Sequence, residues 1–340
     1  MKLLITGMAG FIGHALARRL AGAQLANGER PEIVGIDNLS DYYDVSLKQA
    51  RLDDLADCPN VHFQRLDLAD RDGMAALFRE HRFDRVVHLA AQAGVRYSLE
   101  NPHAYADANL VGQLNVLEGC RHQKVGHLVY ASSSSIYGMN DRVPFATSDA
   151  VDHPISLYAA TKKAGELMAH TYAHLYGLPV TGLRFFTVYG PWGRPDMAMF
   201  KFVRAMFEGR PIQVYNHGDM SRDFTYIDDI VEGIVRILDV IPQGRDDAAA
   251  TATPDVSTAP YALYNIGHGS PVSLMEFIRA LEVATGREAI CDYLPMQPGD
   301  VPRTWADTRA LYRAIGYRPQ TPVEEGARRF VDWYRRYYHV

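Results

Sequence analysis

A short apolar run near the start of the chain leads directly into three regularly spaced glycines. Residues 2–6 predict a buried strand, and Gly7, Gly10 and Gly13 follow it just before a helical pattern. Glycines in such a turn let the backbone approach a pyrophosphate, and the helix N-terminus offers N–H donors and a positive dipole. Because the spacing meets the fingerprint G-x-G-x-x-G only approximately, a plain tight turn is the alternative. We expect a nucleotide-binding α/β fold.

A second apolar run, residues 33–36, ends in Asp37. An acid at the end of the second strand of such a fold can accept hydrogen bonds from the adenosine ribose hydroxyls, and it repels a 2′-phosphate. No arginine follows Asp37 closely in the sequence. We therefore expect NAD rather than NADP as the cofactor, with a simple strand-end cap as the alternative role of Asp37.

Three more strand-like runs alternate with helical patterns near residues 72–81 and 103–123. They end in polar or small residues, which are Asp67 and Leu68 after 61–66, Ala90 and Ala91 after 85–89, and Ser132 to Ser135 after 127–131. This alternation predicts an α/β fold with a Rossmann-like, doubly wound parallel sheet. Ligands of such sheets lie beyond the carboxyl ends of the strands, so one crevice is expected along Asp37, Asp67, Ala90 and Ser133.

The composition excludes several classes of function. The chain has 340 residues and a net charge of −5, so it carries no basic excess for nucleic acid. Its three cysteines are far apart and its 13 histidines show no metal-ligand spacing, so we expect reduced thiols and no metal site. No apolar run approaches the roughly 18 residues that span a membrane. A first strand that starts at residue 2 leaves no room for a signal peptide, so we expect a cytoplasmic protein.

Tyr158 and Lys162 lie four residues apart in a run that predicts a helix over 157–175, with Pro154 before it and Gly177 after it. Residues at this spacing share one helix face. A cation beside a phenol favours the phenolate and lowers the tyrosine pKa from its usual value of about 10. The pair therefore predicts a tyrosine general base. A lysine whose stem covers a half-buried tyrosine is the alternative.

A series of motifs in this order identifies a family. The chain resembles the nucleotide-sugar epimerases among the extended short-chain dehydrogenases/reductases over essentially its whole length. The motifs are Gly7-x-x-Gly10-x-x-Gly13, His88-Leu89-Ala90-Ala91, Asn109, Ser132-Ser133-Ser134-Ser135-Ile136-Tyr137-Gly138, Tyr158-x-x-x-Lys162, Leu183-Arg184-Phe185-Phe186 and Arg222-Asp223-Phe224-x-Tyr226-Ile227-Asp228-Asp229. The resemblance implies an NAD-dependent isomerase.

Residues 91–98 and 187–198 narrow the resemblance to the UDP-glucuronate 4-epimerases. UDP-glucose 4-epimerases usually carry Asn where this chain has Thr187. The 4,6-dehydratases and UDP-glucuronate decarboxylases usually carry an acid where it has Ser134 or Ser135. The resemblance thus implies conversion of UDP-glucuronate to UDP-galacturonate through a 4-keto intermediate, for polysaccharide biosynthesis. A UDP-glucose 4-epimerase, a UDP-glucuronate decarboxylase and a non-catalytic NAD-sensing protein are the alternatives.

The resemblance also implies roles for single residues. Tyr158 is expected to be the base, Lys162 to hold the nicotinamide ribose and lower the pKa of Tyr158, and Ser133 to bridge the reacting sugar oxygen. The residues expected to bind NAD are Gly7, Gly10, Phe11, Ile12, Gly13, Asp37, Asn38, Asp67, Leu68, Leu89, Ala90, Ala91, Asn109, Tyr158, Lys162, Phe185 and Val188. The residues expected to bind the UDP-sugar are Arg96, Ser134, Ser135, Thr187, Arg194, Gln213, Tyr215 and Arg222.

A uronate substrate adds one chemical requirement. Its 4-keto form is a β-keto acid, which loses CO₂ when the carboxylate bond aligns with the carbonyl π system. Hydroxyls and arginines suit the task of holding that carboxylate, because they give charge-assisted and bidentate hydrogen bonds. The candidates are Ser134, Ser135, Thr187 and Arg194, with Arg96 as a second cation. A pyrophosphate contact or a surface salt bridge is the alternative for both Arg194 and Arg96.

The second half of the chain predicts a smaller lobe. We expect an NAD-binding domain at 1–190 and a UDP-sugar-binding lobe at 191–340, with 216–240 packing back onto the first. Surface loops are expected over 24–30 and 244–260. The elements expected in the second half are helices over 200–208, 228–239, 273–285 and 322–338 and a strand over 211–215. Among relatives, homodimers are common, and here apolar faces near 104–118 and 157–176 would form the interface.

Overall fold

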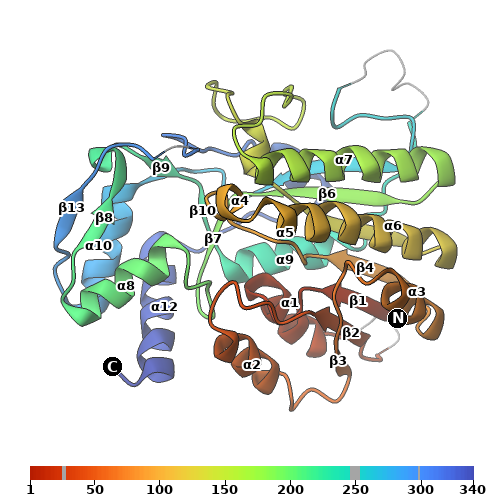
Figure 1. Ribbon diagram of the computed structural model, residues 1–340, viewed down its shortest axis with the longest axis horizontal. Coiled ribbons are helices and arrows are strands. Elements are labelled where there is room, and N and C mark those ends of the chain that lie inside the picture. The colour runs from red at the N-terminus through yellow and green to blue at the C-terminus, as the bar shows by residue number, and fades with distance from the viewer. Residues whose placement is uncertain (25–27, 246–252, 298) are drawn as a thin grey trace.

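The structure is a computed structural model that describes residues 1–24, 28–245, 253–297 and 299–340. Within these residues, seven parallel strands form one sheet in the order β11-β6-β5-β4-β1-β2-β3. Helices cover both faces of the sheet (Figure 1), so the expected Rossmann-like, doubly wound α/β fold is confirmed. The strands are β1 (Lys2–Thr6), β2 (Glu32–Asp37), β3 (Val61–Arg65), β4 (Arg85–His88), β5 (His127–Ser133), β6 (Val180–Phe185) and β11 (Tyr261–Ile266).

Successive residues of the central strands point to opposite faces of the sheet. Leu3 of β1 belongs to the core that includes α1 (Phe11–Ala21) and α9 (Ile227–Ile237). Its neighbour Leu4 belongs to the core on the other face, which is covered by α3 (Arg71–Glu80), α6 (Gly112–Gln123) and α7 (Leu157–Tyr176). Because both faces are buried, these strands are continuous apolar runs in the sequence.

The helix expected over 103–123 is interrupted. The chain forms α5 (Pro102–Ala106), then a π-helical turn at Asp107–Val111, and then α6. Two helices before it were not expected, namely α2 (Val45–Asp54) and α4 (Tyr97–Glu100). Of the expected surface loops, residues 25–27 and 246–252 lie outside the described part of the chain.

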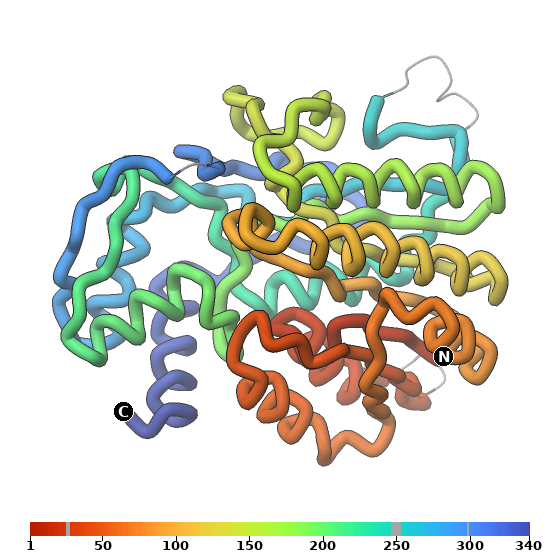
Figure 2. The backbone as a smooth tube through the Cα atoms, viewed as in Figure 1, coloured from red at the N-terminus to blue at the C-terminus, as the bar shows by residue number. Residues whose placement is uncertain are grey.

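A second lobe lies beside the carboxyl ends of the sheet strands (Figure 2). In the lobe, β8 (Ile212–Val214) pairs in parallel with β13 (Cys291–Tyr293). Its helices are α8 (Ala198–Glu208), α10 (Leu274–Thr285) and α12 (Val323–Tyr338). The chain returns to the first lobe three times, because α9 packs on α1, β11 pairs with β6, and α11 (Arg309–Ile315) packs on β11 and α9. Only the first return was expected from the sequence.

Two short strand pairs lie where the lobes meet. One is parallel, between β7 (Thr187–Tyr189) and β10 (Phe224–Tyr226). The other is antiparallel, between β9 (Ser221–Arg222) and β12 (Val272–Ser273). They carry Thr187 and Arg222 to the junction, so local pairing places two of the residues expected to bind the sugar nucleotide.

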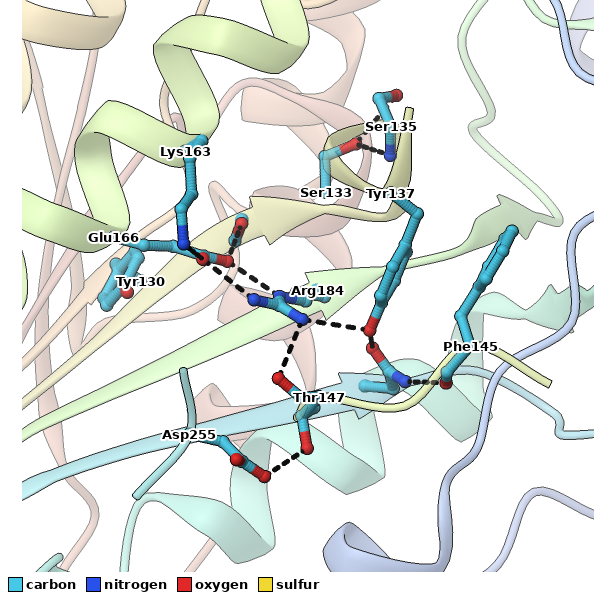
Figure 3. Close-up of polar contacts among 12 residues, drawn as sticks. Tyr130, Ser133, Ser135, Tyr137, Phe145, Thr147, Lys163, Glu166, Arg184 and Asp255 are labelled. Atoms are coloured by element: carbon cyan, nitrogen blue, oxygen red, sulfur yellow. Dashed lines mark hydrogen bonds and ion pairs between the residues drawn. The ribbon is translucent and has the colours of Figure 1, made fainter. Parts of the chain in front are cut away.

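A buried ion pair joins α7 to β6. Arg184 Nε and Nη2 donate to the two carboxylate oxygens of Glu166 at 2.9 and 3.0 Å, and the side chains are 0% and 1% exposed (Figure 3). Ser132 Oγ at the end of β5 donates to the same carboxylate at 2.7 Å. Arg184 Nη1 also donates to the Tyr137 hydroxyl and the Thr147 carbonyl. This network fixes α7 relative to two neighbouring strands.

Replacing Glu166 by Gln should destabilise the protein strongly. The substitution leaves the Arg184 guanidinium buried without a compensating charge, which costs about 3–5 kcal/mol in the free energy of unfolding. Urea unfolding at constant pH measures this loss. The half-exposed Glu325, which pairs with Arg328 and Arg329 on the surface of α12, is the control, and Glu325→Gln should leave the unfolding midpoint almost unchanged. Equal midpoints for the two variants would contradict the importance given to the buried pair.

Candidate active site

The glycine turn between β1 and α1 has the close approaches that exclude side chains. Gly7 has a φ of +75°, and a Cβ there would lie 2.9 Å from the backbone nitrogen of Ala90. A Cβ on Gly13 would lie 2.1 Å from the carbonyl oxygen of Gly7. No side chain caps the N-terminus of α1 at Gly10. The turn therefore offers uncapped N–H groups at a bare backbone surface, which fits a pyrophosphate.

This turn forms one wall of a cavity of about 1110 Å³ that extends between the lobes. Every residue that the sequence predicted for the site, other than Asn109, lines this cavity. Those expected to bind the cofactor are Gly7, Gly10, Phe11, Ile12, Gly13, Asp37, Asn38, Asp67, Leu68, Leu89, Ala90, Ala91, Phe185 and Val188. Those expected to act on or bind the sugar nucleotide are Ser133, Ser134, Ser135, Tyr158, Lys162, Thr187, Arg194, Arg96, Gln213, Tyr215 and Arg222.

Asn109 lies behind the cavity wall instead of on it. Its side chain is 3% exposed, and its Oδ1 accepts from the backbone N–H of Gln92 at 2.8 Å. Its Nδ2 donates to the Gln92 carbonyl at 3.1 Å and to Thr161 Oγ1 of α7 at 3.0 Å. The expected cofactor contact is thus corrected to a supporting position, because these bonds already occupy the amide. Asn109 fixes the loop after β4 against α7.

Asp37 ends β2 at the expected place and has a cation beside it. Its Oδ1 accepts from the backbone N–H of Leu39 at 2.8 Å and lies 3.6 Å from Lys48 Nζ. Lys48 on α2 is 5% exposed, and burial lowers the pKa of its ammonium more than the charge of Asp37 raises it. The other carboxylate oxygen stays available at the cavity surface for a ribose hydroxyl.

Burial and polar neighbours act on the pKa of Tyr158 in opposite directions. Burial raises this pKa above its ordinary value, while Ser133 and the charge of Arg194 lower it. Lys162 Nζ, one turn further along the helix, donates to the Ala131 carbonyl at 3.0 Å. The expected effect of Lys162 on the pKa of Tyr158 stays a prediction.

The residues proposed for a sugar carboxylate gather near Tyr158. Ser133 Oγ at the end of β5 donates to Ser135 Oγ at 3.1 Å (Figure 3). Thr187 begins β7, and Arg194 follows in the loop after that strand. Arg194 Nε and Nη2 donate to the carboxylate of Asp196 at 3.0 and 2.5 Å. One guanidinium and several hydroxyls thus surround the position next to the phenol.

The far end of the cavity carries cations from both lobes. Arg222 Nη1 donates to the carbonyls of Ser221 and Pro302 at 2.9 and 3.0 Å, and burial lowers the pKa of its guanidinium. A half-buried guanidinium that donates to backbone carbonyls suits an anionic ligand. Arg96 pairs with Asp300 at 2.9 Å and stacks on the ring of Tyr215 at 4.8 Å.

Several cavity residues were not predicted from the sequence. They are Tyr42, Tyr43 and Lys48, from the stretch after Asp37, and Asp196, two residues after Arg194. A signal for the first group was present, because Lys48 and Arg51 share one face of a helix that follows the second strand. The partner of Arg194 is only two residues further on in the same loop, and this local contact was not singled out from the sequence.

A family model covers most of the chain. The model of the NAD dependent epimerase/dehydratase family matches residues 3–252. The chain belongs to this family. The expected family, the enzymatic nature of the protein and its NAD cofactor are thereby confirmed, and the glycine turn with its uncapped helix start fits that cofactor.

Relatives and solved structures agree with this assignment. A probable UDP-glucuronate 4-epimerase of Rhizobium meliloti (strain 1021) is 51% identical, covering 99% of this chain and 98% of that protein. The UDP-glucuronic acid 4-epimerase of Bacillus cereus, solved with UDP-glucuronic acid and NAD, matches with a TM-score of 0.84 and 31% identity over 99% of this chain and all of that chain. A UDP-glucose 4-epimerase of Thermotoga maritima, solved with UDP-glucose, has the same TM-score at 28% identity and the same coverage.

The described residues contain neither a candidate metal site nor a membrane-spanning helix. No group of three or more histidine, cysteine, aspartate or glutamate side chains in these residues could hold a metal ion. None of the described helices is long and apolar enough to cross a membrane.

The buried ammonium of Lys162 should make stability depend on pH. Burial lowers its pKa from 10.5 to about 8, so between these values the unfolded chain binds more protons than the folded chain. The free energy of unfolding of the wild type, relative to Lys162→Met, should therefore rise by up to about 3 kcal/mol from pH 8 to pH 10.5. Urea unfolding at a series of pH values measures the difference, with the exposed Lys124→Met as control. If the free energy of unfolding of the wild type relative to Lys162→Met did not change with pH, Lys162 could not be a buried ammonium with a lowered pKa.

Proposed function

We propose that this chain interconverts UDP-glucuronate and UDP-galacturonate by NAD-dependent epimerisation at C4. The observation that carries the proposal is the position of Arg194. Arg194 and Tyr158 line the same cavity, and the charge of Arg194 is close enough to Tyr158 to lower the pKa of the phenol, which burial raises. In a hexuronate the reacting 4-hydroxyl and the C6 carboxylate are neighbours on one edge of the ring, so base and cation must be close together. The Thermotoga enzyme matches the fold equally well, so the fold does not separate uronate from neutral hexose.

Proton transfer is assigned to the phenol and the serine beside it. In its phenolate form Tyr158 accepts the proton of the sugar 4-hydroxyl, and Ser133, which lines the cavity close enough to Tyr158 to lower its pKa, orients the reacting oxygen. Lys162 lines the cavity one helical turn further on, where it can hold the nicotinamide ribose. The glycine turn, Asp37 and Lys162 would hold NAD, which when bound would supply a reversible hydride acceptor for C4, so that the sugar would pass through a 4-keto form.

Epimerisation requires the sugar to present both faces to the cofactor while the nucleotide stays bound. The second lobe anchors the nucleotide, because the half-buried guanidinium of Arg222 is suited to binding the diphosphate. Gln213 and Tyr215 line the same end of the cavity, and the hydroxyl of Tyr215 donates to Gln213 Oε1 at 2.7 Å. The cavity of about 1110 Å³ has room for a cofactor and a turning sugar.

The carboxylate must be held while the 4-keto form exists. Arg194, Ser134, Ser135 and Thr187 can bind it in an orientation in which the bond to CO₂ does not align with the carbonyl π system. Neither Ser134 nor Ser135 is an acid, so the proton donor that a dehydratase needs at these positions is missing. This combination favours an epimerase over a dehydratase, and more weakly over a decarboxylase.

We propose in addition that two chains associate through the outer faces of α6 and α7. The inner faces of these helices pack on the sheet. On the outer side, Leu167 and Leu175 of α7 are 59% and 61% exposed, and Val111 before α6 is 44% exposed. Exposed apolar side chains on neighbouring helices are typical of a surface between subunits.

A deuterium label at C4 tests the proposed reaction directly. UDP-[4-²H]glucuronate is incubated with purified enzyme and unlabelled NAD. Because the same hydride leaves C4 and returns to it, the UDP-galacturonate formed should keep the label, which mass spectrometry measures. Extensive loss of deuterium to solvent would contradict the direct return of hydride. The variant Tyr158→Phe, which lacks the base, should lose most of the activity.

A further inference from the structure

The segment that follows β2 reaches across the cavity to the loop that follows β7. We call residues 42–51 the clasp and residues 192–196 the sugar loop. Arg51 of the clasp is 0% exposed, and its Nη1 donates to the carbonyl of Ala9 in the glycine turn at 2.9 Å. Its Nη2 donates to the carbonyls of Trp192 and Gly193 at 2.6 and 3.3 Å. One guanidinium therefore joins the cofactor-binding turn to the sugar loop.

The clasp makes a second contact at the far end of the sugar loop. The hydroxyl of Tyr42 donates to Asp196 Oδ2 at 3.1 Å, and the same carboxylate binds Arg194. Burial and the charge of Asp196 raise the pKa of Tyr42 to about 12, so this hydroxyl stays a donor at neutral pH. Gly94 leaves room for it, since a Cβ there would lie 2.5 Å from the Tyr42 hydroxyl oxygen. Tyr42 thus fixes the carboxylate that orients Arg194.

The bonds of Arg51 indicate positioning rather than simple packing. Among the described residues, no acid lies within ion-pair distance of Arg51, and the remaining bond of Nη1 goes to the Tyr43 hydroxyl at 2.7 Å. Burying a guanidinium without a carboxylate is costly, and an apolar side chain would fill the space at lower cost. What the guanidinium supplies is a planar fork that fixes backbone carbonyls of two loops at once.

We propose that Arg51 and Tyr42 are positioning residues that hold the sugar loop on the glycine turn. Through them, retention of NAD and recognition of the sugar carboxylate by Arg194 depend on one another. The part that concerns the carboxylate rests on the proposed function, whereas the part that concerns NAD does not. Neither residue needs to touch the reacting atoms.

Conservative variants distinguish a positioning role of Tyr42 and Arg51 from a role in the stability of the fold. Tyr42→Phe removes one hydroxyl, and Arg51→Lys keeps the charge but loses the fork. The matched controls are Tyr293→Phe on the exposed edge of β13 and Arg328→Lys on α12, which lie outside the cavity lining. For each purified holoenzyme we would measure kcat and KM for UDP-glucuronate, the inhibition constant of UDP, the rate of NAD loss on dilution, and the thermal midpoint.

Loss of one positioning bond should change the affected constants roughly fivefold, as expected for one hydrogen bond. Tyr42→Phe should raise the KM for UDP-glucuronate by this factor and leave the inhibition constant of UDP unchanged, because UDP has no carboxylate sugar. Arg51→Lys should raise that KM and also speed NAD loss by at least this factor. The controls should change none of these values.

Two results would overturn the inference. One is an unchanged KM in Tyr42→Phe together with unchanged NAD loss in Arg51→Lys. The other is an equal rise in KM and in the inhibition constant of UDP that follows the fall in thermal midpoint, which is what a purely structural role predicts. If the wild type does not convert UDP-glucuronate, the proposed function fails, and NAD loss from Arg51→Lys still tests the link to the glycine turn.

Discussion

The buried ion pair between Arg184 and Glu166 is the interaction on which the active site depends. Glu166 lies one turn beyond Lys162 on α7, and Lys162 lies one turn beyond Tyr158, so the three share one face of the helix. Glu166 binds β6 through Arg184 and β5 through Ser132, the neighbour of Ser133. The base and its serine therefore keep their relative positions because one carboxylate connects the elements that carry them. Removing either charge would leave the other buried and uncompensated.

Three cations at or behind the cavity wall bind backbone carbonyls. Lys162 donates to the carbonyl of Ala131, Arg222 to those of Ser221 and Pro302, and Arg51 to those of Ala9, Trp192 and Gly193. Carbonyls fix the direction of these cations without neutralising their charge. A dinucleotide, a nucleoside diphosphate and a carboxylate are all anions, so such cations favour them. Other cations of the cavity lining pair with carboxylates, as Lys48 does with Asp37, Arg96 with Asp300 and Arg194 with Asp196.

Much of this arrangement could be predicted from the sequence because it depends on local rules. The carboxyl ends of parallel strands meet at one edge, so Asp37, Ala90 and Ser133 were expected together, and they line one cavity. Contacts that form only when the chain folds could not be predicted from the sequence. One example is Asn109, whose side chain is bonded to Gln92 and Thr161. Another is β11, which pairs with β6 although a segment of the second lobe lies between them in the sequence. The pKa of Tyr158 depends on burial, Ser133 and Arg194, none of which the spacing of Tyr158 and Lys162 reveals.

The products formed from UDP-glucuronate, without added NAD, test the account most directly. Wild-type enzyme and Arg194→Ala are incubated side by side, and the sugar nucleotides are separated and weighed by mass spectrometry. The wild type should give UDP-galacturonate of unchanged mass. Arg194→Ala should lose its preference for the uronate or release a UDP-pentose by loss of CO₂. A wild type that releases CO₂, or that converts UDP-glucose and leaves UDP-glucuronate unchanged, would contradict the assignment of the carboxylate site.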